Sequence, residues 1–179
     1  TITGRMAHAV PNMAQVPAVY SPYGRECRGL WTVDDVSKHR LVGVDASGLE
    51  LRCLAHYMND PEYTNIVLTG DVHTANQERA GLKTRDQAKT FIYAFLYGAG
   101  AAKIGKVVGG TAKHGQQLIT RFLNNMPALK HLRMLVSKEA AGDTIKALDG
   151  RLLHIRSEHA ALNTLLQGAG AIVCKQWLV

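Results

Sequence analysis

The chain has 179 residues, of which 46% are hydrophobic and 20% are charged. This balance is typical of a folded globular chain and excludes a collagen-like or disordered one. Lysine and arginine outnumber aspartate and glutamate by 21 to 14, so the formal net charge is +7, which favours a polyanionic partner. Three cysteines without a C-x-x-C pair fit neither a disulfide framework nor a zinc site and indicate a reducing compartment.

Targeting and membrane signals are missing from the sequence. No basic segment followed by an apolar run opens the chain. Polar residues interrupt the most apolar stretch, 160–174, so we expect no membrane span. The chain starts at Thr1 and stops at Val179 within a helical pattern that has no glycine cap, so we expect a fragment of a longer protein.

The N-terminal part combines a lead-in with one strand and the start of a helix. Residues 1–29 are rich in proline, glycine and asparagine, which predicts irregular structure. The apolar run 41–44 predicts a buried strand whose end presents Asp45. The spacing of Ser47 and Glu50 is that of a capping box, so a helix is expected directly after it.

Helical patterns dominate the middle of the chain. Asp71 precedes a short predicted helix that carries His73. Thr84 and Gln87 have the spacing of a second capping box, and the helix that they open is expected to end before Gly98.

The last third is predicted to hold helices and one hairpin. Residues 113–141 have a helical pattern with Pro127 as a break. Asp-Gly at 149–150 predicts a hairpin turn, followed by the alternating segment 153–156. A last helix is expected from about His159.

The helix expected at 85–97 carries an unusual row of side chains. Arg85, Lys89, Tyr93 and Tyr97 recur every fourth residue, so they follow one edge, while apolar residues form a core-facing stripe on the opposite side. Cations followed by phenols suit a nucleoside triphosphate, because cations bind phosphates and aromatic rings stack on a base. A solvated face with two amphipathic tyrosines is the alternative that this row leaves open.

Two carboxylates and one histidine are further candidates. Asp45, at the end of the predicted strand, suits a metal ligand, or else it caps the following turn. Glu50 can reach back to the backbone of Ser47 as part of the capping box. Taken alone, His73 has the pattern of a surface histidine.

Two segments resemble motifs of family A DNA polymerases, the bacterial polymerase I type, and especially the replicative enzymes of short-tailed phages. The segment DASGLELR at 45–52 resembles motif A, and the helix with R-x-x-x-K-x-x-x-Y-x-x-x-Y-G at 85–98 resembles motif B. T-G-R at 3–5 and P-N-M-A-Q-V-P at 11–17 are similar to two further segments of the family.

The resemblance implies an α+β fold, in which a palm sheet fragment carries an inserted helical fingers subdomain. Residues 1–60 would be the palm entry, 61–148 the fingers and 149–179 the return into the palm. The implied activity is that of a DNA-directed DNA polymerase, which adds deoxynucleotides to a primer 3′ end during DNA replication. The family's His-Asp-Glu motif is expected beyond Val179, because the chain has no His-Asp or Asp-Glu pair, so the isolated piece is expected to be inactive.

The resemblance also implies roles for residues around the reacting groups. Asp45 and the carbonyl oxygen of Ala46 would hold magnesium, of which the complete enzyme uses two ions. Tyr93 would lie against the incoming base and sugar, and Tyr97 near the templating base. Glu50 would close the space beside the sugar 2′ position and so exclude ribonucleotides.

Further implied roles concern phosphates and DNA. Arg85, Lys89 and His73 would bind the β- and γ-phosphates, so Arg85 and Lys89 join Asp45 as implied catalytic residues. Three other polar side chains would contact the minor groove at the primer end: Arg5, Asn163 and Gln167. Primer-template DNA and deoxynucleoside triphosphates are the implied partners, and the full-length protein could also bind a processivity factor. No membrane partner is implied, and the implied location is the host cytoplasm.

Two other functions stay open in the sequence. A ribonuclease-H-like nuclease would need several carboxylates near Asp45, with Asp71, Asp143 and Asp149 as candidates, whereas the polymerase interpretation gives these three little part in the chemistry. A non-catalytic basic module would bind nucleic acid through phosphates alone.

Overall fold

The computed structural model describes residues 1–10, 12 and 15–179. The segment at 11–17 that resembles a family motif therefore lies partly outside the described residues. The chain divides into two compact units, one of Thr1 with 6–47 and the other of 2–5 with 48–179. The proposed division into palm entry, fingers and palm return stays a prediction.

The unit of residues 6–47 holds one described helix, α1 (Gly24–Gly29), among turns and extended chain. The predicted strand at 41–44 is wrong. Leu41, Val42 and Val44 are exposed, and no strand is assigned to them. An isolated strand leaves its backbone N–H and C=O groups unpaired, and no described segment of this unit forms a ladder with 41–44.

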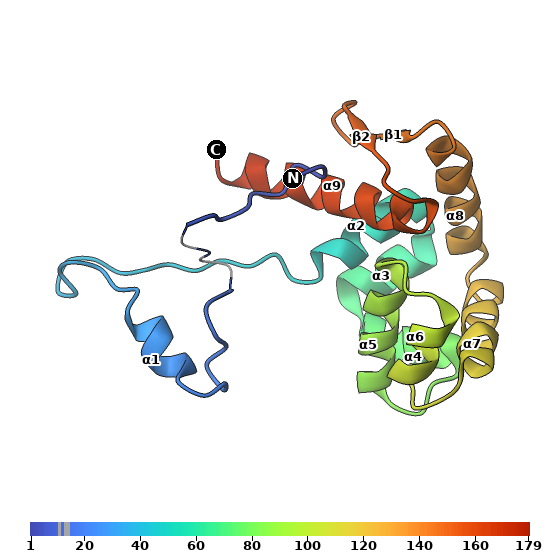
Figure 1. Ribbon diagram of the computed structural model, residues 1–179, viewed down its shortest axis with the longest axis horizontal. Coiled ribbons are helices and arrows are strands. Elements are labelled where there is room, and N and C mark those ends of the chain that lie inside the picture. Colours follow the sequence, from blue (N-terminus) through green and yellow to red (C-terminus); the bar gives the residue numbers. More distant parts are fainter. Residues whose placement is uncertain (11, 13–14) are drawn as a thin grey trace. The chain divides into compact units, whose positions relative to one another are not determined.

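The second unit is helix-rich and contains one antiparallel pair of strands (Figure 1). Its elements in chain order are α2 (Leu49–Met58), α3 (Pro61–Thr69), α4 (Val72–Ala80), α5 (Arg85–Leu96), α6 (Ala101–Val107), α7 (Ala112–Asn124), α8 (Pro127–Ala140), β1 (Thr144–Lys146), β2 (Leu152–His154), the 3-10 turn η2 (Glu158–Ala160) and α9 (Ala161–Trp177). The break at Pro127 and the hairpin are as predicted, whereas α3 and α6 were not expected.

The helices of this unit form two neighbouring groups. Helix α2 packs against α9, and α4, α5, α6 and α7 pack on one another in sequence. Helix α8 contacts α7 as well as α2 and α9, and so joins the groups (Figure 1). The predicted fold class therefore holds in its coarse form, helices with a small sheet, and its palm and fingers parts stay a prediction.

Local capping decides where the helices that carry candidate residues begin. The hydroxyl of Thr84 accepts a hydrogen bond from the backbone N–H of Gln87 at 3.2 Å, as expected at the start of α5. At α2 the predicted capping box is wrong, because Gly48 and not Ser47 occupies the N-cap position. Gly48 has φ of 60° and gives no side-chain cap, which shifts the helix start by one residue and leaves Glu50 in the first turn.

The core of the α5 group is built from aromatic rings. Phe122 of α7 meets Phe91 and Phe95 of α5 edge to face, with ring centroids 5.1 Å and 5.5 Å away. Edge-to-face packing places the positive ring edge on the negative face of its neighbour. The predicted core stripe of α5 is confirmed, since all five of its members are buried: Ala88, Phe91, Ile92, Phe95 and Leu96.

Two glycines allow α6 and α7 to approach closely. A Cβ atom on Gly105 would lie 2.1 Å from the carbonyl oxygen of Thr111, and one on Gly115 would lie 2.0 Å from that of Ala101. These distances are too short for any side chain. The backbone contact therefore requires glycine at both positions.

We expect Gly115→Ala to lower the free energy of unfolding by about 1–3 kcal/mol, because the methyl group must push α7 away from α6. Chemical denaturation of the full-length protein measures this change. Gly142→Ala is the matched control, since its Cβ would meet the carbonyl oxygen of Glu139 at an ordinary 3.7 Å. Equal stability of the two variants would contradict the close approach.

Candidate functional site

The outer edge of α5 presents the predicted row of side chains. Arg85 and Lys89 are exposed, Tyr93 is half-buried and Tyr97, at the C-cap, is 48% exposed. The rings of Tyr93 and Tyr97 lie 6.3 Å apart between centroids. The aromatic core on the opposite face holds the helix, so its edge offers cations at one end and phenols at the other.

His73 of α4 lies beside this row. Its ring centroid is 6.2 Å from that of Tyr93, and its Nδ1 atom is buried without a hydrogen-bond partner. Burial, followed by the positive charge of Arg85, lowers the pKa of His73, and the carboxylate of Asp71 opposes this effect. The structure therefore brings a neutral imidazole next to the two cations of α5.

Arg85 is held by an ion pair that sequence reasoning missed. Its Nε donates to Oδ2 of Asp71 at 2.6 Å and its Nη2 donates to Oδ1 at 3.2 Å. The guanidinium keeps the pKa of Asp71 far below that of an ordinary aspartate. Asp71 is also the expected N-cap of α4, so the cap was predicted and the ion pair was not. No motif indicates a pair between two helices across a turn.

Glu50 lies near the phenol end of the row. It is half-buried in the first turn of α2. Burial raises the pKa of Tyr93 and of Tyr97, and the negative charge of Glu50 raises both further. The structure thus brings together Glu50 and the two tyrosines that the sequence placed around one nucleotide.

The three residues predicted to contact the minor groove belong to the same unit as Tyr97. Nη1 of Arg5 donates to Oε1 of Gln167 at 3.1 Å. The positive charge of Arg5 acts to lower the pKa of Tyr97, against the effects of burial and Glu50. Asn163 lies one helical turn before Gln167 on α9, and both are half-buried. Polar groups from the N-terminal segment and the last helix therefore meet near the end of α5.

Gly98, just after α5, lies against the 3-10 turn η2 that precedes α9. Its φ is +75°, and a Cβ atom there would lie 2.3 Å from the carbonyl oxygen of His159. Both facts require glycine after Tyr97. The glycine that ends the motif B pattern at 85–98 is therefore required by the local backbone geometry.

The predicted metal ligands lie in the other unit, so their position relative to the α5 row is not described. Asp45 is exposed and Ala46 is half-buried in the unit of residues 6–47. Within residues 1–10, 12 and 15–179, no group of three His, Cys, Asp or Glu side chains could hold a metal ion. One carboxylate and one carbonyl are an incomplete donor set for a cation that takes about six oxygen ligands.

This result also weighs against the nuclease alternative. Such an enzyme needs several converging carboxylates, and within the described unit of residues 2–5 and 48–179 no group of three His, Cys, Asp or Glu side chains could hold a metal ion. Asp71 is engaged by Arg85, and Asp149 accepts hydrogen bonds from Nε of Arg151. These carboxylates serve helix starts and turns.

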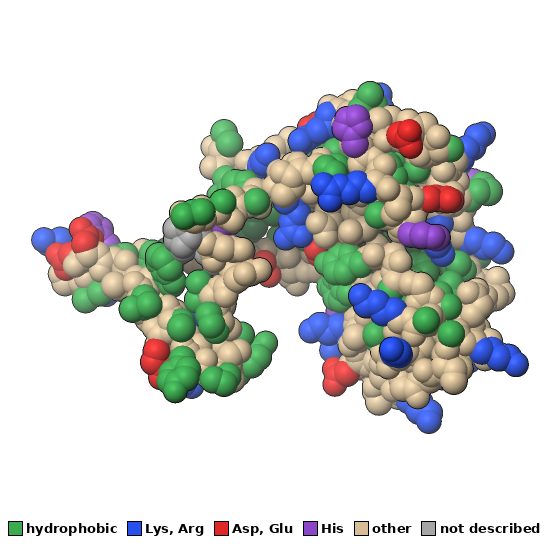
Figure 2. Space-filling model, in the orientation of Figure 1, with side chains coloured by type: hydrophobic (Ala, Val, Ile, Leu, Met, Phe, Trp, Pro, Cys, Tyr) green, Lys and Arg blue, Asp and Glu red, His purple; other side chains and the backbone are tan. Residues whose placement is uncertain are grey.

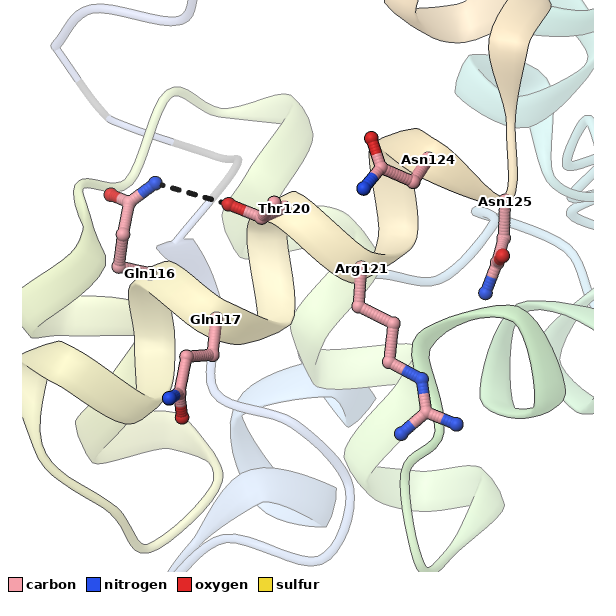
Figure 3. A pocket seen from close by; sticks show the side chains of 6 residues that line it. All are labelled: Gln116, Gln117, Thr120, Arg121, Asn124 and Asn125. Carbon is pink, nitrogen blue, oxygen red and sulfur yellow. Dashed lines mark hydrogen bonds between the residues drawn. The ribbon is translucent and has the colours of Figure 1, made fainter.

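A hollow of about 600 Å³ lies along α7, outside every motif of the sequence (Figure 3). Amide, hydroxyl and guanidinium groups line it: Gln116, Gln117, Thr120, Arg121, Asn124 and Asn125. Basic side chains are spread over the same unit (Figure 2). The stretch 101–138 contains seven lysines and arginines and no aspartate or glutamate.

In the described part of the chain, no helix is long and apolar enough to cross a membrane.

Comparison with known proteins covers the whole chain. The model of the family "DNA polymerase family A" matches residues 1–179. The chain is 50% identical over 202 aligned residues to the DNA-directed DNA polymerases of Enterobacteria phage T3 and Escherichia phage T7. Each alignment covers 99% of this chain and 29% of the relative, so the chain spans about three tenths of their length.

A solved structure shares the fold. It is the POL domain of Pol1 from M. smegmatis in complex with DNA primer-template and dNTP. The TM-score is 0.79 at 20% identity, and the match covers 98% of this chain and 34% of that one.

We expect His73 to titrate below an exposed histidine and Arg85→Ala to raise its pKa, because the substitution removes a repelling charge and frees Asp71. Since folding lowers this pKa, the linked stability is present above the pKa of an unfolded histidine and is lost as the pH falls from that value through the lower pKa of the folded state. NMR titration of the histidine rings in the full-length protein measures both pKa values. An unchanged pKa in Arg85→Ala would contradict the described geometry.

Proposed function

The chain belongs to DNA polymerase family A, and we propose that it supplies nucleotide-binding and DNA-contacting residues of a DNA-directed DNA polymerase. The longer protein would add deoxynucleotides to a primer 3′ end in DNA replication in the host cytoplasm. One observation carries the proposal: the row on α5 offers cations and phenols side by side, with the imidazole of His73 and the carboxylate of Glu50 near it.

The cationic end of α5 would bind the triphosphate. Arg85 and Lys89 project from successive turns, and His73 adds an imidazole from α4. Cations at this position offset charge that develops on the leaving pyrophosphate, so they favour the transition state over the ground state. His73 would take up a proton as the negative phosphates approach, because nearby negative charge raises its pKa.

The phenol end would bind the base and sugar. Tyr93 would lie against the incoming nucleotide and Tyr97 near the templating base, where aromatic faces stack without reading sequence. Glu50, whose charge reaches both phenols, would close the space beside the sugar 2′ position.

Polar groups near the end of α5 would contact the primer-template. The pair Arg5 and Gln167, with Asn163 one turn away, supplies donors for the N3 and O2 acceptors of the minor groove. These acceptors recur in every base pair, so such contacts would check pair geometry rather than sequence.

Asp45 and the carbonyl of Ala46 would contribute oxygen ligands of the kind that magnesium prefers. Asp45 precedes Glu50 by five positions in the sequence. The remaining ligands would come from the rest of the longer protein. The two ions of the complete enzyme would activate the primer hydroxyl and neutralise the leaving phosphates.

In the full-length polymerase, Lys89→Ala should lower kcat/KM for single-nucleotide incorporation by about 100-fold, because a cation at the leaving phosphates is lost. Lys83→Ala is the control, since Lys83 is exposed in the turn before α5 and lies outside the row. Steady-state incorporation on a defined primer-template measures both.

The same pair of variants separates the proposal from a non-catalytic basic module. Such a module predicts that both substitutions weaken DNA binding alike, by one phosphate contact each, with a matching change in salt dependence. Equal incorporation by Lys89→Ala and Lys83→Ala would refute the role of the α5 row.

Glu50→Ala should raise the ratio of ribonucleotide to deoxynucleotide kcat/KM by about 10-fold or more, because the substitution opens space beside the sugar 2′ position. The measurement is incorporation of matched ribonucleotides and deoxynucleotides by the full-length polymerase. Glu78→Ala, on the exposed side of α4, should leave the ratio unchanged. An unaltered ratio in Glu50→Ala would exclude the sugar-selecting role.

A further inference from the structure

One carboxylate connects two of the groups assigned to the triphosphate. Asp71 accepts two hydrogen bonds from the guanidinium of Arg85, at 2.6 Å and 3.2 Å. The same carboxylate accepts hydrogen bonds from the backbone N–H of His73, at 3.0 Å, and from the hydroxyl of Thr74, at 3.0 Å. Asp71 thus joins the start of α5 to the first turn of α4.

The geometry leaves Arg85 able to bind a second anion. Asp71 uses Nε and Nη2 of the fork, and no hydrogen bond to Nη1 is present among the described residues. The ion pair is open to solvent, with half of the Arg85 side chain and 44% of the Asp71 side chain exposed. A guanidinium gripped along one edge presents its other donors in a fixed direction.

We propose that Asp71 is a positioning residue for the triphosphate, which orients Arg85 by the ion pair and His73 by the helix cap. The inference rests on the proposed function of the α5 row. Asp71 does not touch substrate in this role. By holding Arg85 before phosphate binds, Asp71 restricts the rotamers of this long side chain. Less conformational entropy is then lost on binding.

The chain offers a matched control for the capping role. Asp60 caps α3, where its carboxylate accepts a hydrogen bond from the backbone N–H of Tyr63 at 3.1 Å. No ion pair of Asp60 is present in the described part of the chain. Asp60→Asn and Asp71→Asn therefore weaken the same kind of cap, and only the second removes the charge that faces Arg85.

The experiment uses full-length polymerase bound to a primer-template with a dideoxy-terminated primer. Equilibrium Kd for the next dNTP is measured for Asp71→Asn, Asp60→Asn, Arg85→Ala and the double variant of Asp71 and Arg85. KM and kcat are measured with an extendable primer. We expect Asp71→Asn to raise Kd and KM about 10-fold, the scale of one charge-assisted hydrogen-bond pair, and to change kcat much less. Asp60→Asn should match the parent protein.

The double variant decides between positioning and general stability. We expect it to bind dNTP no more weakly than Arg85→Ala alone, because Asp71 acts through Arg85. Should Asp71→Asn lower the unfolding temperature, Asp71→Ser keeps an N-cap oxygen and allows the same comparison.

Three results would overturn the inference: additive losses in the double variant, equal Kd values for Asp71→Asn and Asp60→Asn, or tighter dNTP binding by Asp71→Asn, which would make Asp71 a competitor of the phosphates. An unchanged Kd in Arg85→Ala would instead refute the proposed function itself, so the two failures are distinguishable.

Discussion

The candidate site depends on how the apolar face of α5 packs against the core. Phe91 and Phe95 pack edge to face on Phe122, and the whole apolar stripe of α5 is buried. Because that face is fully occupied by packing, the opposite edge is fixed in direction with its cations and phenols outward. The contacts from α4, His73 with Tyr93 and Asp71 with Arg85, are made to an edge that the aromatic core has already oriented.

The elements around this edge of α5 each supply different functional groups. Helix α4 brings an imidazole and a carboxylate to the cationic end, and α2 brings Glu50 to the phenol end. The N-terminal segment and α9 add the pair Arg5 and Gln167. Residues that are 162 positions apart in sequence therefore meet in one unit, which explains why a segment as short as 2–5 belongs to it.

Much of this arrangement follows from local sequence. The row on α5, its buried stripe and the Thr84 cap all depend on helical periodicity and on side chains close in sequence. The resemblance to known motifs added Glu50, Arg5 and Gln167, whose proximity to α5 no periodicity could indicate.

The predictions that were wrong, and the ion pair that was missed, have physical causes that local sequence does not contain. The apolar run 41–44 has the composition of a strand, but strands need a partner, and none is paired with it in the described unit. Gly48 displaced Ser47 from the cap because a left-handed backbone turn decides which residue becomes the N-cap. The ion pair between Asp71 and Arg85 depends on how two helices pack, which neither helix encodes alone.

The acid-free stretch 101–138, which covers α6, α7 and α8 up to Lys138, has a consequence for the response to ionic strength. Its seven cations are all exposed and have no carboxylate within the stretch to offset them, so they repel one another. Dissolved ions screen such repulsion over a Debye length of about 8 Å at physiological salt. Rising salt therefore weakens the repulsion among these cations, and it also weakens the solvent-exposed ion pair of Arg85 with Asp71. The same counterions thus relieve a repulsion in one part of the molecule and reduce an attraction in another.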